Sequence, residues 1–202
     1  MAHGFRRAAV LVFVLAAVVS LSGCWVFSVY PLAGPNDDLL FDKLLTGNWW
    51  SAQNKCSVSF TRLSDERVYH VVYMTAKDAG EGCWLGQGET TSFEGKVVEL
   101  GGSRFLDIVP TDVPLRNHMV LAHSFYRLKF DVNSLTLTPM NYQVMEGLMQ
   151  EDKLHGVQRG DNIMALTANT KELREFIRQN ATSQEVWNDG GKLEFQRRYD
   201  GQ

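Results

Sequence analysis

The sequence predicts a mainly β protein with one or two helices, folded as a closed or nearly closed antiparallel β-barrel, with a β-sandwich as the alternative. Three observations predict this class. From residue 49 onward, short segments alternate apolar and polar residues. Turn-forming residues separate these segments, and only one segment has a clear helical pattern. The segments amount to about nine or ten strands, which is enough to close a barrel.

Two segments carry the alternation most clearly. In "CSVSFTRL", Val58 and Phe60 share one face, and "SFYRLKFDV" repeats the pattern over residues 124–132. A turn at Asn133 and Ser134, followed by "LTLT", predicts a hairpin. Further strands are expected at residues 68–75, 83–93, 96–100, 105–109, 163–168 and 193–199.

The clearest helix is expected in "NTKELREFIRQN". Asn169 can cap it, and Glu172 stands three residues later as the partner of a capping box. An apolar stripe follows, formed by Leu173, Phe176 and Ile177. A second helix is expected over residues 142–150.

The N-terminus has the layout of a secretory leader, with basic residues at Arg6 and Arg7 before an apolar run over residues 8–19. The run ends at Leu21-Ser22-Gly23-Cys24, which resembles the lipobox of bacterial lipoprotein precursors. The resemblance implies that residues 1–23 are a signal peptide and that Cys24 becomes the lipidated first residue, with diacylglycerol on its thiol. An uncleaved membrane anchor and an ordinary signal peptide are the alternatives.

The same resemblance implies a location in the bacterial cell envelope, with the membrane as a partner through the lipid on Cys24. Trp25, rather than aspartate, follows the cysteine, which favours the outer over the inner membrane. Residues 24–38 contain Pro31 and Gly34 among other turn residues and are expected to form an extended tether. A single β-rich domain is then expected over residues 39–202, in the periplasm or at the surface.

Size and charge limit the range of functions. Cleavage before Cys24 leaves 179 residues, enough for one domain with a sizeable core. The leader holds two of the 20 basic residues and none of the 23 acidic ones, so the mature formal charge is −5. This acidic balance argues against a nucleic-acid partner.

Two further cysteines, Cys56 and Cys83, would reach an oxidising compartment together and are expected to form a disulfide. On the chain-entropy model, closing that loop stabilises the fold by about 3.5 kcal/mol. A redox or metal pair is the alternative, but neither cysteine belongs to a Cys-x-x-Cys unit and no histidine lies near them in sequence.

A second resemblance involves the first strand. Phe41-Asp42 and Gly47-Asn48-Trp49 are similar to the N-terminal signature of lipocalins. That resemblance implies an eight-stranded barrel closed at one end by the tryptophan, with an arginine of the last strand packed across its ring. Arg197 is the better candidate for this arginine and Arg198 the second. The alternative is that Trp49 is an ordinary core aromatic residue.

The whole chain also resembles uncharacterised bacterial lipoproteins, which share the leader, the "YPL" tether, the "FD" and "GNW" motifs and the "TKEL" helix. This wider resemblance brings no known activity. It leaves the ligand or partner to be inferred from the structure.

No catalytic motif was found in the chain: a nucleophile elbow, a P-loop, a dinucleotide fingerprint and a zincin motif are all absent. No cofactor or metal is expected, and His70 is expected to be a core or barrel-lining residue. The leading hypothesis is a non-enzymatic binding module for an apolar small molecule or an envelope protein. The alternative is an envelope hydrolase that uses Asp107, a candidate buried carboxylate, with His70 or His123.

Overall fold

Eight antiparallel strands close into a barrel in the computed structural model, which describes residues 25–34, 39–63, 67–79, 86–112, 121–159, 163–188 and 191–199. The barrel strands are β2 (Gly47–Ser51), β3 (Cys56–Arg62), β4 (Val68–Thr75), β5 (Thr90–Leu100), β6 (Ser103–Pro110), β7 (Ser124–Phe130), β8 (Ser134–Pro139) and β11 (Leu193–Arg198). Each strand pairs with the next, and β11 closes the ring between β8 and β2. The expected barrel is therefore confirmed, and the sandwich alternative is wrong.

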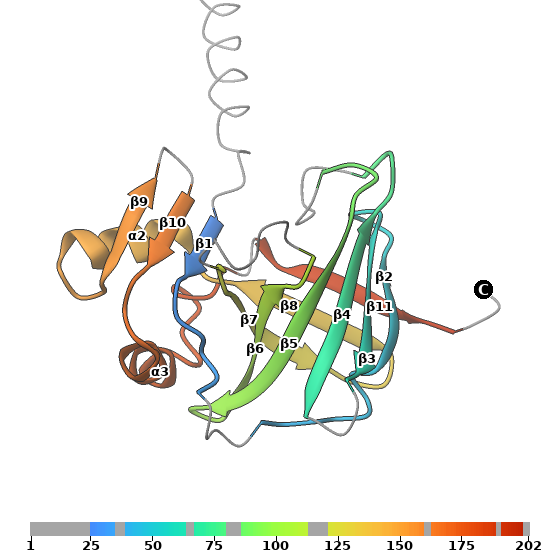
Figure 1. The fold of residues 1–202 in the computed structure, drawn as a ribbon, viewed down its shortest axis with the longest axis horizontal. Coiled ribbons are helices and arrows are strands. Elements are labelled where there is room, and N and C mark those ends of the chain that lie inside the picture. Colours follow the sequence, from blue (N-terminus) through green and yellow to red (C-terminus); the bar gives the residue numbers. More distant parts are fainter. Residues whose placement is uncertain are drawn as a thin grey trace, which may run out of the picture.

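A second layer covers one side of the barrel (Figure 1). It consists of a three-stranded sheet, in which β1 (Trp25–Ser28) runs parallel to β10 (Ile163–Leu166) and β10 runs antiparallel to β9 (Gly156–Arg159). Two helices, α2 (Tyr142–Gln150) and α3 (Thr170–Gln179), complete it. Among the described residues, no helix is both long and apolar enough to cross a membrane.

The barrel interior is filled by every second residue of its strands, as the alternation predicts. The largest fully buried side chains inside it are Trp49, Phe60, Tyr69, Tyr73 and Phe195. They belong to β2, β3, β4 and β11, and smaller buried side chains of β5, β6 and β8, such as Val97, Leu106 and Leu137, pack in the same interior.

The outward residues of β5, β6 and β7 form a second core under the helices. The ring of Phe105 on β6 lies 4.9 Å from that of Trp187, and the Trp187 indole donates to the Asn180 carbonyl at 3.0 Å. Leu173 and Ile177 of α3 are buried in the same core. Asn169 and Glu172 form the expected capping box at the start of α3.

Strand β5 joins two segments that were expected to be separate strands. These were residues 83–93 and 96–100, whereas β5 begins at Thr90 and runs without a break through Gly95 to Leu100. A side chain at Gly95 would have its Cβ only 2.8 Å from the Val71 side chain. The glycine therefore permits the close approach of β4 and does not end a strand.

Residues 25–34 differ from the expected tether, because they pack into the fold. β1 is paired with β10, and Leu32 is completely buried. The Leu32 and Ala33 amides donate to one oxygen of Asp107, at 2.8 and 3.3 Å. The turn residues Pro31 and Gly34 suggested a linker. The contact between Leu32 and Asp107, 75 positions apart, could not be predicted from the residues around Leu32.

Candidate ligand site at the barrel mouth

A pocket of about 300 Å³ lies at the end of the barrel where β5 and β7 begin and β6 ends. We refer to this end as the mouth. Its lining is almost entirely apolar and consists of Trp25, Phe27, Thr91, Phe93, Ile108, Pro110, Ser124, Tyr126 and Ile163. None of these side chains carries a charge. The volume is at the lower limit of pockets that hold small molecules, which is about 300 Å³.

Three neighbouring barrel strands form the inner wall of the pocket. Phe93 of β5 lies opposite Pro110 of β6, and Ile108 of β6 lies opposite Ser124 of β7. Since side chains alternate along a strand, these residues point inward together with Tyr126. The register of β5, β6 and β7 therefore creates the pocket wall.

Strand β1 forms the outer wall. The rings of Trp25 and Phe27 are stacked, with centroids 6.1 Å apart and planes 6° apart, and both line the pocket. Ile163 of β10 lies directly beside Trp25 in the register and remains 44% exposed. Because side chains alternate along β1, Trp25 and Phe27 face the pocket, whereas Val26 between them packs against the core under the helices.

The lining contains three hydroxyl groups, those of Thr91, Ser124 and Tyr126. The Tyr126 hydroxyl is hydrogen-bonded to the side chain of Ser124, and burial raises the pKa of Tyr126 well above its ordinary value. The phenol is therefore neutral over the physiological pH range. A neutral phenol beside a serine hydroxyl provides a polar pair that can orient the head of an otherwise apolar ligand.

The opposite end of the barrel is closed by Trp49 and Arg197. The Arg197 guanidinium lies over the Trp49 ring, 4.0 Å from its centroid, and the two residues are opposite each other in the β2–β11 register. Arg197 also donates to the carbonyls of Thr46 at 2.8 Å and of Leu44. This is the arrangement that the lipocalin resemblance implies for these two residues.

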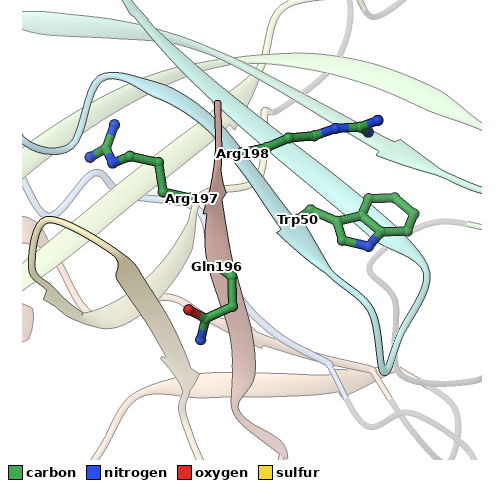
Figure 2. A pocket seen from close by; sticks show the side chains of 4 residues that line it. All are labelled: Trp50, Gln196, Arg197 and Arg198. Atoms are coloured by element: carbon green, nitrogen blue, oxygen red, sulfur yellow. The ribbon is translucent and has the colours of Figure 1, made fainter. Parts of the chain in front are cut away.

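An open hollow of about 450 Å³ lies next to this closed end and is lined by Trp50, Gln196, Arg197 and Arg198. Figure 2 shows Arg197 and Arg198 leaving β11 on opposite sides, with Arg198 on the side of Trp50. Arg198 therefore does not take part in closing the barrel. The hollow is broad and shallow and lacks the enclosing walls of the mouth pocket.

The structure brings Asp107 and His123 together outside the barrel wall. Oδ1 of Asp107 lies 2.7 Å from Nδ1 of His123, and the carboxylate is 3% exposed. His70 is not part of this pair, because it lies on β4, two strands away from β6. Its position between the inward Tyr69 and Val71 places it on the outer face, so its expected place in the core or barrel lining is wrong.

Three cysteines were assigned roles from the sequence. Cys24 and Cys83 lie outside the described residues, and Cys56 is buried in β3. The lipidation of Cys24 and the pairing of Cys56 with Cys83 therefore stay predictions. Within the described ranges, no three histidine, cysteine, aspartate or glutamate residues are grouped as a metal site would require.

The mouth pocket was not predicted from the sequence. The alternation in "SFYRL" placed Tyr126 on a buried face, but whether a barrel is open or filled depends on how side chains from several strands pack. Trp25 and Phe27 were assigned to the tether. Their spacing of two residues, with Val26 between them, was the pattern that could have predicted a strand with both rings on one face.

The fold and the pocket define a class: a closed, eight-stranded antiparallel barrel, filled at one end and with an apolar pocket at the other. Comparison of the chain with protein-family models, with curated proteins and with solved structures gives no match.

Proposed function

We propose that the chain is a lipid-anchored binding module of the bacterial cell envelope, without enzymatic activity, that holds an apolar small molecule at the mouth of its barrel. The observation that carries the proposal is the uncharged pocket between β1 and the inner faces of β5, β6 and β7. Burying an apolar ligand there gains roughly 25 cal/mol for each Å² removed from water.

Binding is tested by titrating the chain from residue 24 onward, carrying Cys24→Ser, with the apolar fluorescent probe N-phenyl-1-naphthylamine. All the strands described above lie within this part of the chain. Saturable binding with a fluorescence increase is expected. Thr91→Trp places a large ring in the pocket and should weaken the affinity at least tenfold.

Ser92→Trp is the matched control, because Ser92 is the next residue on β5 and points to the outer face. It should leave the affinity within about twofold of the parent. Equal affinity of the parent and Thr91→Trp would contradict binding in the mouth pocket.

The anchoring part of the proposal rests on Leu21-Ser22-Gly23-Cys24. Two or three acyl chains at one cysteine hold a domain on a bilayer, whereas a single chain binds reversibly. Cys24→Ala is expected to stop labelling by a fatty-acid probe and to leave unprocessed precursor. Normal labelling of that variant would refute the anchor at Cys24. Fractionation of the native membranes should place the chain with the outer membrane.

A hydrolase is the second candidate, favoured by the contact between Asp107 and His123. A carboxylate on Nδ1 would leave Nε2 of His123 as the base. However, the other oxygen of Asp107 accepts the Leu32 and Ala33 amides. Ser28, whose backbone pairs with that of His123, does not offer a free nucleophile either, because its hydroxyl donates to the Tyr30 carbonyl. These contacts support a structural role for the pair.

Hydrolysis of p-nitrophenyl butyrate separates the two roles. If the pair is structural, the parent chain and His123→Gln have the same rate as buffer. A rate above buffer that is lost in His123→Gln would favour the hydrolase.

A further inference from the structure

We infer that the mouth end of the barrel is the surface that faces the lipid bilayer, and that the pocket takes the acyl chain of a membrane lipid directly from it. This inference rests on the proposed anchor at Cys24 and names the ligand class of the proposed pocket. It adds an orientation of the barrel relative to the membrane.

A single peptide bond separates Cys24 from the lining of the pocket. Trp25 is the next residue, only about 3.8 Å away between Cα atoms, and its side chain already lines the pocket. A lipidated Cys24 would therefore hold the mouth within a few ångströms of the lipid headgroups.

Strand β1 and the residues after it are held firmly on the barrel. All four of its residues pair with β10. The Ser28 amide donates to the His123 carbonyl at 2.9 Å, and the His123 amide donates to the Ser28 carbonyl at 2.8 Å. Asp107 then holds Leu32 and Ala33. Because these contacts join β1 to the residue before β7, and the segment after β1 to β6, an anchor at residue 24 fixes the orientation of the whole barrel.

Apolar and aromatic side chains gather on the β1 side of the mouth. Trp25, Phe27 and the exposed Ile163 line the pocket there, and tryptophan favours the membrane interface. Ion pairs occur at both ends of the barrel, between Arg104 and Asp42 at the closed end and between Lys55 and Asp78 at the end of the mouth. Since charged groups favour water, the β1 side of the mouth, whose pocket lining carries no charge, is the part of the surface that fits the bilayer best.

The orientation is tested with the lipidated chain in vesicles of phosphatidylethanolamine and phosphatidylglycerol. An environment-sensitive thiol probe is placed at the mouth by Ile163→Cys and at the closed end by Val132→Cys. Both residues are exposed, β-branched and apolar, at 44% and 54% exposure, so the variants are matched. Seven residues of β7 separate the two ends by roughly 20 Å. The parent chain gives the background labelling of Cys56 and Cys83.

Lipids that carry a doxyl quencher should reduce most of the emission at position 163 and little of it at position 132. Equal quenching at both positions, or stronger quenching at 132, would overturn the orientation without affecting probe binding in solution. A chain that does not associate with the vesicles would overturn the anchor and this inference together.

The ligand class is tested in the same vesicles with a phosphatidylethanolamine that has a photoreactive group in its acyl chain. Crosslinks are expected on β5, β6 and β7, and Thr91→Trp should reduce them at least fivefold while Ser92→Trp leaves them intact. Crosslinks that are absent, or insensitive to Thr91→Trp, would overturn the acyl-chain ligand. N-phenyl-1-naphthylamine binding would remain as separate evidence for the pocket.

Discussion

The Arg197 guanidinium covers the ring of Trp49 at 4.0 Å and donates to backbone carbonyls of two other segments, at Thr46 and Val132. One side chain thus joins the last strand, the loop before the first barrel strand and the turn between β7 and β8. Gly47 belongs to the same arrangement for two reasons. Its φ is 121°, which other residues rarely adopt, and a Cβ at this position would lie 2.8 Å from the Arg197 guanidinium.

Replacing Arg197 should therefore open the closed end. Arg197→Ala is expected to lower the free energy of unfolding by about 2–4 kcal/mol, because it removes the ring contact and leaves carbonyls without a donor. Urea unfolding measures this loss. Arg198→Ala is the control on the outer face of β11 and should cost less than about 0.5 kcal/mol. Equal losses in the two variants would contradict the role of Arg197.

Asp107 should control the attachment of residues 28–33. Asp107→Ala leaves the buried amides of Leu32 and Ala33 without their acceptor and should lower the free energy of unfolding by about 2–4 kcal/mol. Asp107→Asn keeps an acceptor and should cost less.

Hydrogen exchange gives a local measure of the same effect. The Leu32 and Ala33 amides should exchange faster in Asp107→Ala than in the parent. The amides of β3, which lie in the barrel wall away from Asp107, should keep their protection from exchange under conditions where the barrel remains folded. Unchanged protection at both amides would show that Asp107 does not hold this segment.

The sequence predicted the elements that short-range patterns specify. The β7–β8 hairpin and α3 with its capping box at Asn169 follow from alternation and from residues three positions apart. The resemblance to lipocalins also made Arg197 the better candidate, before Arg198, to cover Trp49, and the guanidinium of Arg197 lies over that ring. These features need only local spacing or a known motif.

The parts that could not be predicted depend on contacts between distant segments. Asp107 accepts amides that lie 74 and 75 positions earlier in the chain, which converts the expected tether into part of the fold. Gly95 suggested a break because its role depends on Val71 in the neighbouring strand. The pocket likewise forms where β1 meets three barrel strands, and no single segment encodes that meeting.

The predicted disulfide between Cys56 and Cys83 can be tested by alkylation. In protein isolated without reductant, both thiols should resist modification in denaturant, and a reductant should make both reactive. Cys83→Ser should lower the free energy of unfolding by about 3.5 kcal/mol, because it releases the loop that the bond closes. Reactive thiols at both positions before reduction would contradict the pairing.

The turn between β7 and β8 should depend on pH through Asp131. The Ser134 hydroxyl donates to its carboxylate at 2.7 Å, and the Asn133 and Ser134 amides donate at 2.7 and 2.8 Å. These hydrogen bonds, with the Ser134 hydroxyl first, lower the pKa of Asp131. Since the carboxylate is favoured in the folded state, its contribution to stability is present above the ordinary pKa of about 3.9.

That contribution is lost as the pH falls through the lowered pKa of the folded state. The free energy of unfolding of the parent should therefore decrease more on acidification than that of Asp131→Asn. NMR titration of the Asp131 carboxyl carbon measures the pKa directly, and Ser134→Ala should move it back toward the ordinary value. Ser57→Ala, on a different strand, should leave it unchanged. An ordinary pKa for Asp131 in the parent would show that the three donors do not favour the ionised form.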